Sequence, residues 1–177
     1  MRRGVLFLGM VMVLGGCASS TPRPAAFGGN AALSATCAEL AGRYLEAPSH
    51  ATGEGRESLS SLLGRVLDNP PKVSAPTAFT LSFPQNRVMR VQFFNLKGED
   101  IGTVDLRESR AEYRCGEGVL EIATGTQRLL SAGSETLTFT RTSGNYLMIR
   151  RAGFKMSPIG GIPLPGMRED WYVFTRI

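Results

Sequence analysis

The side chains that could do chemistry in this chain are few and widely spaced. The one histidine, His50, lies in residues 47–57, a polar stretch whose glycines favour a loop. A Ser-His-Asp arrangement needs a histidine held rigidly beside its nucleophile, and such a loop gives no rigid support. A structural zinc ion needs four Cys or His ligands, more than this composition can supply. We therefore expect no catalytic histidine, no metal and no cofactor.

Paired carboxylates are a second route to acid–base chemistry. The adjacent pairs Glu99-Asp100 and Glu169-Asp170 occur in segments typical of turns or loops, so we interpret both as solvated. A glycine-rich phosphate loop leads into a helix, whereas Gly160-Gly161 leads into prolines. The sequence therefore predicts a protein that is not an enzyme.

The first cysteine ends a segment with the layout of a secretory signal peptide. Two arginines are followed by an apolar run, residues 4–14, then by two glycines and Cys17. A helix of that length is much shorter than the apolar layer of a bilayer, about 30 Å thick. A permanent transmembrane helix is therefore not expected here.

Leu14-Gly15-Gly16-Cys17 resembles the lipobox of bacterial lipoproteins, in which the Cys thiol receives a diacylglycerol and the chain is cleaved just before it. The resemblance implies a signal peptide over residues 1–16 and lipid attachment at Cys17. The next residues, Ala18 and Ser19, resemble the pattern that sorts lipoproteins to the outer membrane. An ordinary signal peptide with a chance cysteine at its end is the alternative.

Two cysteines remain once Cys17 carries a lipid. Secretion would place Cys37 and Cys115 in an oxidising compartment, where an even number of cysteines tends to pair. We therefore predict a Cys37–Cys115 disulfide. Two separate buried thiols are the alternative.

Composition divides the chain after the signal peptide into a tether and one domain. Residues 17–36 are rich in Ala, Ser, Thr, Pro and Gly, and such a segment buries too little apolar surface to fold alone. We expect a flexible lipidated tether that reaches roughly 25 Å, followed by a β-rich globular domain over residues 37–177. The formal net charge of +5 is modest and no run of Lys or Arg occurs, so nucleic acid is not an expected partner.

Apolar and polar residues alternate with a period of two from Ala78 onward, the pattern of half-buried strands. Short connections between these segments favour a meander of about eight strands, in an antiparallel barrel or a strongly curved sheet. One segment, Ser58–Leu67, has helical spacing with Ser58 as its N-cap. We expect this helix to pack on the sheet or close a barrel end, and a partner-binding helix is the alternative. The expected strands are 78–83, 89–93, 101–106, 112–115, 119–124, 136–142, 145–151 and 171–176.

A long connection, residues 152–169, separates the last two of these strands. It holds three prolines and four glycines, and connections of this length are often functional. We interpret it as a lid over the sheet edge or barrel mouth. The alternative is a surface that meets a ligand, a membrane or a partner. The apolar residues that would form this surface are Phe154, Met156, Ile159, Ile162 and Leu164.

Basic residues cluster around the same connection. Arginine suits bidentate contacts to phosphate and carboxylate, and the anions of an outer membrane include lipopolysaccharide and phospholipid head groups. Arg150, Arg151, Lys155 and Arg168 are therefore candidate contacts for an anionic partner. A solvated strand face is the alternative.

Two further resemblances concern the fold. Gly42 and Tyr44 resemble the opening strand of lipocalin-like barrels, which carry Trp at the place of Tyr44. Three segments, Cys37 to Tyr44, Tyr113 to Gly118 and Trp171 to Phe174, are similar to small proteobacterial lipoproteins of unknown function. That similarity implies a fold and an address but no activity.

These observations lead to one functional hypothesis and one alternative. The hypothesis is a lipoprotein anchored in the outer membrane and facing the periplasm, a non-catalytic structural or interaction module of the cell envelope. Its partners would be the membrane, through the N-terminal lipid, and an envelope protein or anionic lipid. The alternative is a carrier of a small ligand or lipid in the barrel interior.

Overall fold

The computed structural model describes residues 23, 25, 37–52, 55–85, 87–116, 119–123, 135–142, 144–159 and 162–177. Within these ranges, the side chains of 154–159 and 162–166 are left undescribed. The predicted signal peptide, the predicted lipidation site and nearly all of the predicted tether lie outside the described residues. The predictions that the structure tests therefore concern the predicted domain, residues 37–177.

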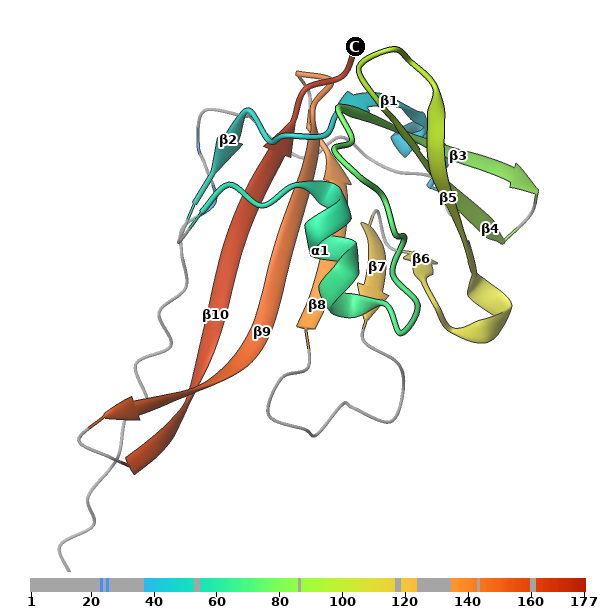
Figure 1. Ribbon diagram of the computed structural model, residues 1–177. Coiled ribbons are helices and arrows are strands. Elements are labelled where there is room, and N and C mark those ends of the chain that lie inside the picture. The colour runs from blue at the N-terminus through green and yellow to red at the C-terminus, as the bar shows by residue number, and fades with distance from the viewer. Residues whose placement is uncertain are drawn as a thin grey trace, which may run out of the picture.

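The described part of the chain is mainly β, as predicted, with one α-helix (Figure 1). The described residues form ten strands where about eight were expected, and the last two are much longer than predicted. In chain order the elements are β1 (Gly42–Leu45), β2 (His50–Ala51), α1 (Leu59–Val66), β3 (Ala78–Gln85), β4 (Val88–Phe94), β5 (Asp100–Arg107), β6 (Arg114–Gly116), β7 (Val119–Ala123), β8 (Glu135–Arg141), β9 (Leu147–Ile159) and β10 (Ile162–Phe174).

The strands form two antiparallel sheets. One has the order β1-β3-β4-β5 and the other the order β2-β10-β9-β8-β7-β6. Most neighbours in these sheets are also neighbours along the chain, which agrees with the predicted meander. The pairing register is continuous along β9 and β10, from Ile162↔Ile159 to Phe174↔Leu147.

The two sheets meet where the chain end passes β1. The backbone N–H of Leu45 donates to the carbonyl of Thr175 at 3.0 Å, and that of Ile177 donates to the carbonyl of Arg43 at 2.9 Å. An antiparallel bridge pairs Tyr44 with Arg176 between these bonds. The first strand of the domain therefore lies beside its last residues. On the other side, β5 and β6 are sheet edges, so the strands within the described residues form no closed barrel.

Aromatic rings pack against one another in the hydrophobic core. The Tyr44 and Phe79 rings stack with centroids 5.3 Å apart, and Phe174 meets Phe79 edge-on at 5.6 Å. These rings, with those of Phe93 and Phe139, have almost no solvent exposure. Along β4 the buried residues alternate with partly exposed ones, so the period of two in the sequence identified the core face there, whereas Val173 beside Phe174 is also fully buried.

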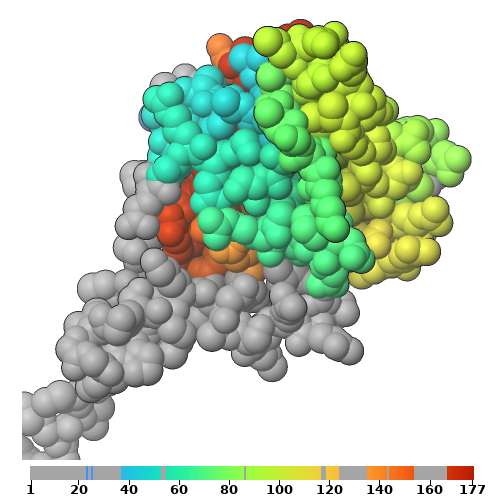
Figure 2. Space-filling view, viewed as in Figure 1, coloured from blue at the N-terminus to red at the C-terminus, as the bar shows by residue number. Residues whose placement is uncertain are grey.

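Helix α1 adds one apolar face to this core. Leu59, Leu62, Leu63 and Val66 are buried, at the spacing expected for one side of a helix. The Ser58 hydroxyl accepts from Ser61 N at 3.3 Å, which confirms the predicted N-cap. Figure 2 shows the helix and the segment that follows it covering one face of the molecule. Packing on the core, the first of the two expectations for this helix, is therefore confirmed.

Residues 152–169 correct the sequence prediction. They were expected to be an irregular connection, but residues 152–159 and 162–169 form the distal parts of β9 and β10, two strands of 13 residues each. The three prolines in this segment did not break the strands because they lie in a two-stranded part of the ladder, where one edge of each strand needs no N–H donor.

Candidate functional site

The distal parts of β9 and β10 form a two-stranded ribbon. Strand β8 last pairs with β9 at Glu135↔Gly153, and β2 pairs with β10 at Tyr172 and Val173 alone. Beyond these points, neither strand has a second neighbouring strand among the described residues. We call residues 154–159 and 162–168 the ribbon. Figure 1 shows it extending away from the body of the domain.

The register divides the predicted apolar contacts between two faces of the ribbon. Residues alternate between faces along a strand, and Phe154 pairs with Met167 while Met156 pairs with Pro165. Phe154 and Met156 therefore share one face. Ile159, Ile162 and Leu164 belong to the other face, together with Lys155 and Arg168. The structure thus brings all of these residues into one ribbon but not onto one surface.

Arg151 lies at the base of the ribbon and is 5% exposed. It belongs to the face of β9 that also carries Ile149, a core residue. Its Nη1 is 2.8 Å from Oε1 of Glu57, and its Nη2 is 3.4 Å from Oε1 of Glu135 and 4.0 Å from Oδ2 of Asp170. These three carboxylates surround the guanidinium. Arg151 is therefore a core residue rather than a contact for an external anion, which corrects the sequence interpretation.

Further arginines neutralise the same carboxylates. Arg168 donates to Asp170 at 2.7 Å, and Arg65, at the end of α1, donates to Glu57 at 2.9 Å. Arg151, Arg168 and Arg65 thus face an equal number of acidic groups. This charge network is buried at Arg151 and Asp170 and more exposed at Arg65. It connects α1, β8, β9 and β10 at the point where the ribbon leaves the domain.

Arg150 is also neutralised. Its Nε lies 3.3 Å from Oε1 of Glu169, an ion pair without good hydrogen-bond geometry. All three predicted arginines therefore have carboxylate partners, which weakens the case for an anionic ligand. Lys155, the fourth predicted cation, has no described side chain.

Asp170 shows what the sequence interpretation missed at this site. The sequence context suggested a solvated carboxylate, yet Asp170 is 2% exposed. Its spacing could have indicated burial, because Asp170, Tyr172 and Phe174 occupy alternate positions and share the core face of β10. Glu57 and Glu135 gave no comparable signal because their contact with Arg151 spans distant parts of the chain.

The predicted disulfide is confirmed. Cys37 and Cys115 are bonded, with a sequence separation of 78. The bond connects the first described segment of the domain to β6, the edge strand of the larger sheet. It therefore fixes the N-terminal end of the described domain.

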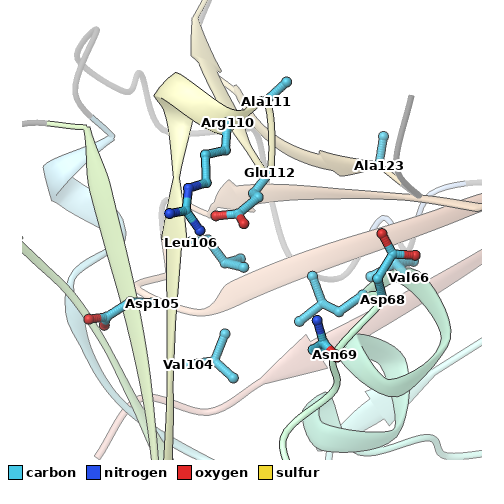
Figure 3. Close-up of a pocket in the computed structure, with 11 residues that line it drawn as sticks. Val66, Asp68, Asn69, Val104, Asp105, Leu106, Arg110, Ala111, Glu112 and Ala123 are labelled. Carbon is cyan, nitrogen blue, oxygen red and sulfur yellow. The ribbon is translucent and has the colours of Figure 1, made fainter. Parts of the chain in front are cut away.

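A surface cleft of about 460 Å³ lies between the end of α1 and strand β5 (Figure 3). Val66 and Leu106 contribute apolar walls, and Asp68 faces Arg110 and Glu112 across the opening. Glu112 accepts a hydrogen bond from the backbone N–H of Arg107 at 2.7 Å. The cleft contains neither histidine nor cysteine, and no group of three metal-binding side chains occurs anywhere in the described residues.

His50 lies in the two-residue strand β2, where it pairs through the backbone with Val173. It is not among the described residues that line the cleft. Glu99 accepts from the side chain of Asn95 at 2.7 Å in the turn before β5. His50 and Asp100 thus belong to different sheets, His50 in β2 and Asp100 in β5.

The chain was compared with protein-family models, with curated proteins and with solved structures, and none matched. Among the described helices, none has the length and apolar character needed to cross a bilayer. A function must therefore be argued from the geometry of the ribbon and its base.

Proposed function

We propose that this chain is a bacterial lipoprotein, attached to the outer membrane through Cys17 and facing the periplasm, that acts as a non-catalytic structural or interaction module of the cell envelope. The lipobox-like residues Leu14–Cys17 support the anchor. The similarity to small proteobacterial lipoproteins, carried by the segments around Cys37, Cys115 and Trp171, supports the same address.

The observation that carries the interaction role is the ribbon. A two-stranded ribbon by itself is only marginally stable in water, yet here the β9–β10 ladder continues well past its neighbouring strands. Its residues include many with apolar side chains, and Met167, the first on β10 with a described side chain, is 55% exposed. Apolar residues on an element that leaves the body of the domain can form a contiguous patch, and such patches mark interaction sites. The proposed partner is another envelope component.

We also propose that the strand array is barrel-like, with α1 and residues 67–77 covering the gap between β5 and β6. The contact between β1 and the chain end supports this proposal. A carrier would need an apolar cavity inside such a barrel. The packing of Tyr44, Phe79 and Phe174 in that interior argues against the carrier alternative.

Fractionation tests the anchor. The Cys17→Ala variant should leave the membrane fraction, whereas Cys37→Ala paired with Cys115→Ala should stay in it, because those two cysteines carry no lipid. Unchanged membrane association of Cys17→Ala would contradict the proposed attachment.

Photo-crosslinking tests the interaction role. A photoreactive residue at Leu164, in the ribbon, should capture a discrete envelope component in intact cells. The matched control is Leu96, which is 89% exposed in the turn before β5, on a different part of the domain. Equal capture from both positions would overturn the proposal.

A further inference from the structure

One face of the ribbon contains only uncharged residues. The pairs Phe154↔Met167, Met156↔Pro165 and Pro158↔Pro163 alternate with pairs that include Lys155 and Arg168. Because alternate residues share a face, the first set lies together. We call it the uncharged face, and its residues are Phe154, Met156, Pro158, Pro163, Pro165 and Met167.

The edges of the ribbon are unsuited to adding another strand. The carbonyls of Trp171 and Val173 accept from Thr52 and Ser49, so the odd-numbered positions of β10 direct their backbone groups toward its outer edge. The register continues unbroken to Pro165 and Pro163, which occupy such positions and have no N–H to donate.

The edge of β9 has the same feature. Pro158 pairs with Pro163, so it too is an outward-directed position. Proline at edge positions blocks the hydrogen bonds that an added strand would need. A partner must therefore contact a face of the ribbon rather than extend its sheet.

The uncharged face is too small for a stable protein interface on its own. It covers on the order of 200 Å², taking about 3.3 Å per residue along a strand and about 5 Å between strands. A typical protein–protein interface buries about 800 Å² on each partner. A second copy of the chain is disfavoured for the same reason.

A bilayer surface avoids this limitation. Insertion at the interface of a bilayer requires apolar area but no complementary shape. The proposed lipid at Cys17 and a tether of roughly 25 Å would keep the ribbon near the membrane, so a small apolar face adds to an existing anchor.

The residues toward the base of the same face have the polarity expected at the head-group level. Arg150 and Glu169 form an ion pair there, and Trp171 has the same register parity. Tryptophan is enriched where a membrane protein crosses from acyl chains to head groups. The face thus passes from apolar residues at its distal end to paired charges and Trp171 at its base.

We infer that the uncharged face of the ribbon inserts into the head-group and acyl-chain boundary of the phospholipid bilayer that carries the lipid anchor. This inference rests on the proposed lipid anchoring and names the partner of the proposed interaction site. Because the predicted arginines have carboxylate partners, the insertion is driven by apolar contact, and zwitterionic phospholipid is sufficient.

Tryptophan quenching in vesicles tests the insertion. Full-length lipidated protein carrying Trp171→Phe would be reconstituted into phosphatidylcholine vesicles brominated on the acyl chains. In that background, Met156→Trp reports on the uncharged face. Ser157→Trp is the matched control on the opposite face, and Leu96→Trp controls for proximity due to the anchor alone.

The expected result is quenching of Met156→Trp that is several-fold stronger than that of either control. Phe154→Trp gives a second reading if the substitution at Met156 prevents folding. Equal quenching of the Met156→Trp and Leu96→Trp proteins would overturn insertion. Equal and strong quenching of Met156→Trp and Ser157→Trp would overturn the assignment to one face.

Failure of this inference can be told apart from failure of the proposed function. If the vesicles show no insertion while Leu164 captures a discrete protein in cells, the bilayer is the wrong partner and the interaction role stands. If Cys17→Ala stays with the membrane and Leu164 captures nothing above Leu96, the proposed function itself is wrong.

Discussion

Arg151 in β9 and Glu57 in the segment before α1 form an ion pair of 2.8 Å. The side chain of Arg151 is 6% exposed and that of Glu57 16% exposed. Glu135 and Asp170 lie on the other side of the guanidinium. This relationship fixes the base of the ribbon to the helix that covers the core, so the direction of the ribbon depends on a buried charge balance.

Replacing Arg151 with methionine should destabilise the fold strongly. The change would leave Glu57, Glu135 and Asp170 near one another without the central cation. Removing one partner from a buried ion pair typically costs about 3–5 kcal/mol. Denaturant unfolding of Arg151→Met measures this loss directly.

The control is Arg90→Met. Arg90 also contacts a carboxylate, with Nε 2.7 Å from Oδ1 of Asp105, but both side chains are more than a third exposed. Water can solvate the carboxylate that remains, so Arg90→Met should change the unfolding free energy far less. Similar losses in the two variants would show that burial is not what makes Arg151 important.

Gly42 and Gly64 should respond in opposite directions to alanine. A Cβ at Gly42 would lie 2.7 Å from Nε of Arg176, whose Nη2 donates to the Ala41 carbonyl at 2.9 Å. These atoms are the far end of a flexible side chain, so the guanidinium can shift, and the expected cost is that of its hydrogen bond to Ala41, about 0.5–1.5 kcal/mol. A Cβ at Gly64, inside α1, would meet nothing within 4 Å, and alanine favours a helix interior by about 0.5–1 kcal/mol.

Urea midpoints of the two variants provide the comparison. Gly42→Ala should unfold at lower urea than the native protein and Gly64→Ala at higher urea. A stabilising effect of Gly42→Ala would mean that Arg176 does not occupy the space beside the glycine.

Loss of the Cys37–Cys115 bond should destabilise the domain because the unfolded chain gains freedom. For a sequence separation of 78, the chain-entropy model gives on the order of 4 kcal/mol. The Cys37→Ser/Cys115→Ser double variant should therefore unfold at markedly lower urea under non-reducing conditions. Adding reductant should lower the native midpoint toward that of the variant and leave the variant unchanged. A native protein insensitive to reductant would contradict the prediction.

Local patterns in the sequence were enough to predict the β-rich class and the helix, and the cysteine count with the expected oxidising compartment predicted the disulfide. Alternation such as that of Leu137 and Phe139 reports directly on which side of a strand is buried. The cap at Ser58 and the two prolines after Asn69 mark the ends of the helix by local chemistry alone.

The ribbon and its base were beyond such local patterns. Proline usually signals a break in a strand, and its meaning at Pro163 and Pro165 depends on which edge of the ladder it occupies. The charge network brings together Glu57, Glu135 and Arg151 from distant parts of the chain. Nothing in the residues near Arg151 indicates that its partners would surround it in the core.

The carboxyl group of Glu46 is buried, and its ionisation makes the free energy of unfolding depend on pH. It is 2% exposed, and its Oε1 accepts from the backbone N–H of Ser60 at 2.7 Å, at the start of α1. Its Oε2 is buried without a hydrogen-bond partner among the described residues. Burial raises the pKa of Glu46 above its ordinary value of 4.5, although hydrogen bonds from Ser60 and Ser58 oppose the shift.

The raised pKa fixes the direction of the pH dependence. Between pH 4.5 and the pKa in the folded state, the unfolded chain has lost the Glu46 proton while the folded protein retains it. Unfolding then releases a proton, so the Glu46 contribution makes the native protein less stable as pH rises through this window.

Glutamine cannot ionise, and Glu46→Gln lacks this contribution. The free energy of unfolding of Glu46→Gln, relative to that of the native protein, should therefore increase from pH 4 toward neutral pH, with pH 4 as the internal reference. Denaturant titrations of both proteins across that range measure the difference, and a constant or decreasing difference would mean that the pKa of Glu46 is not raised in the folded state.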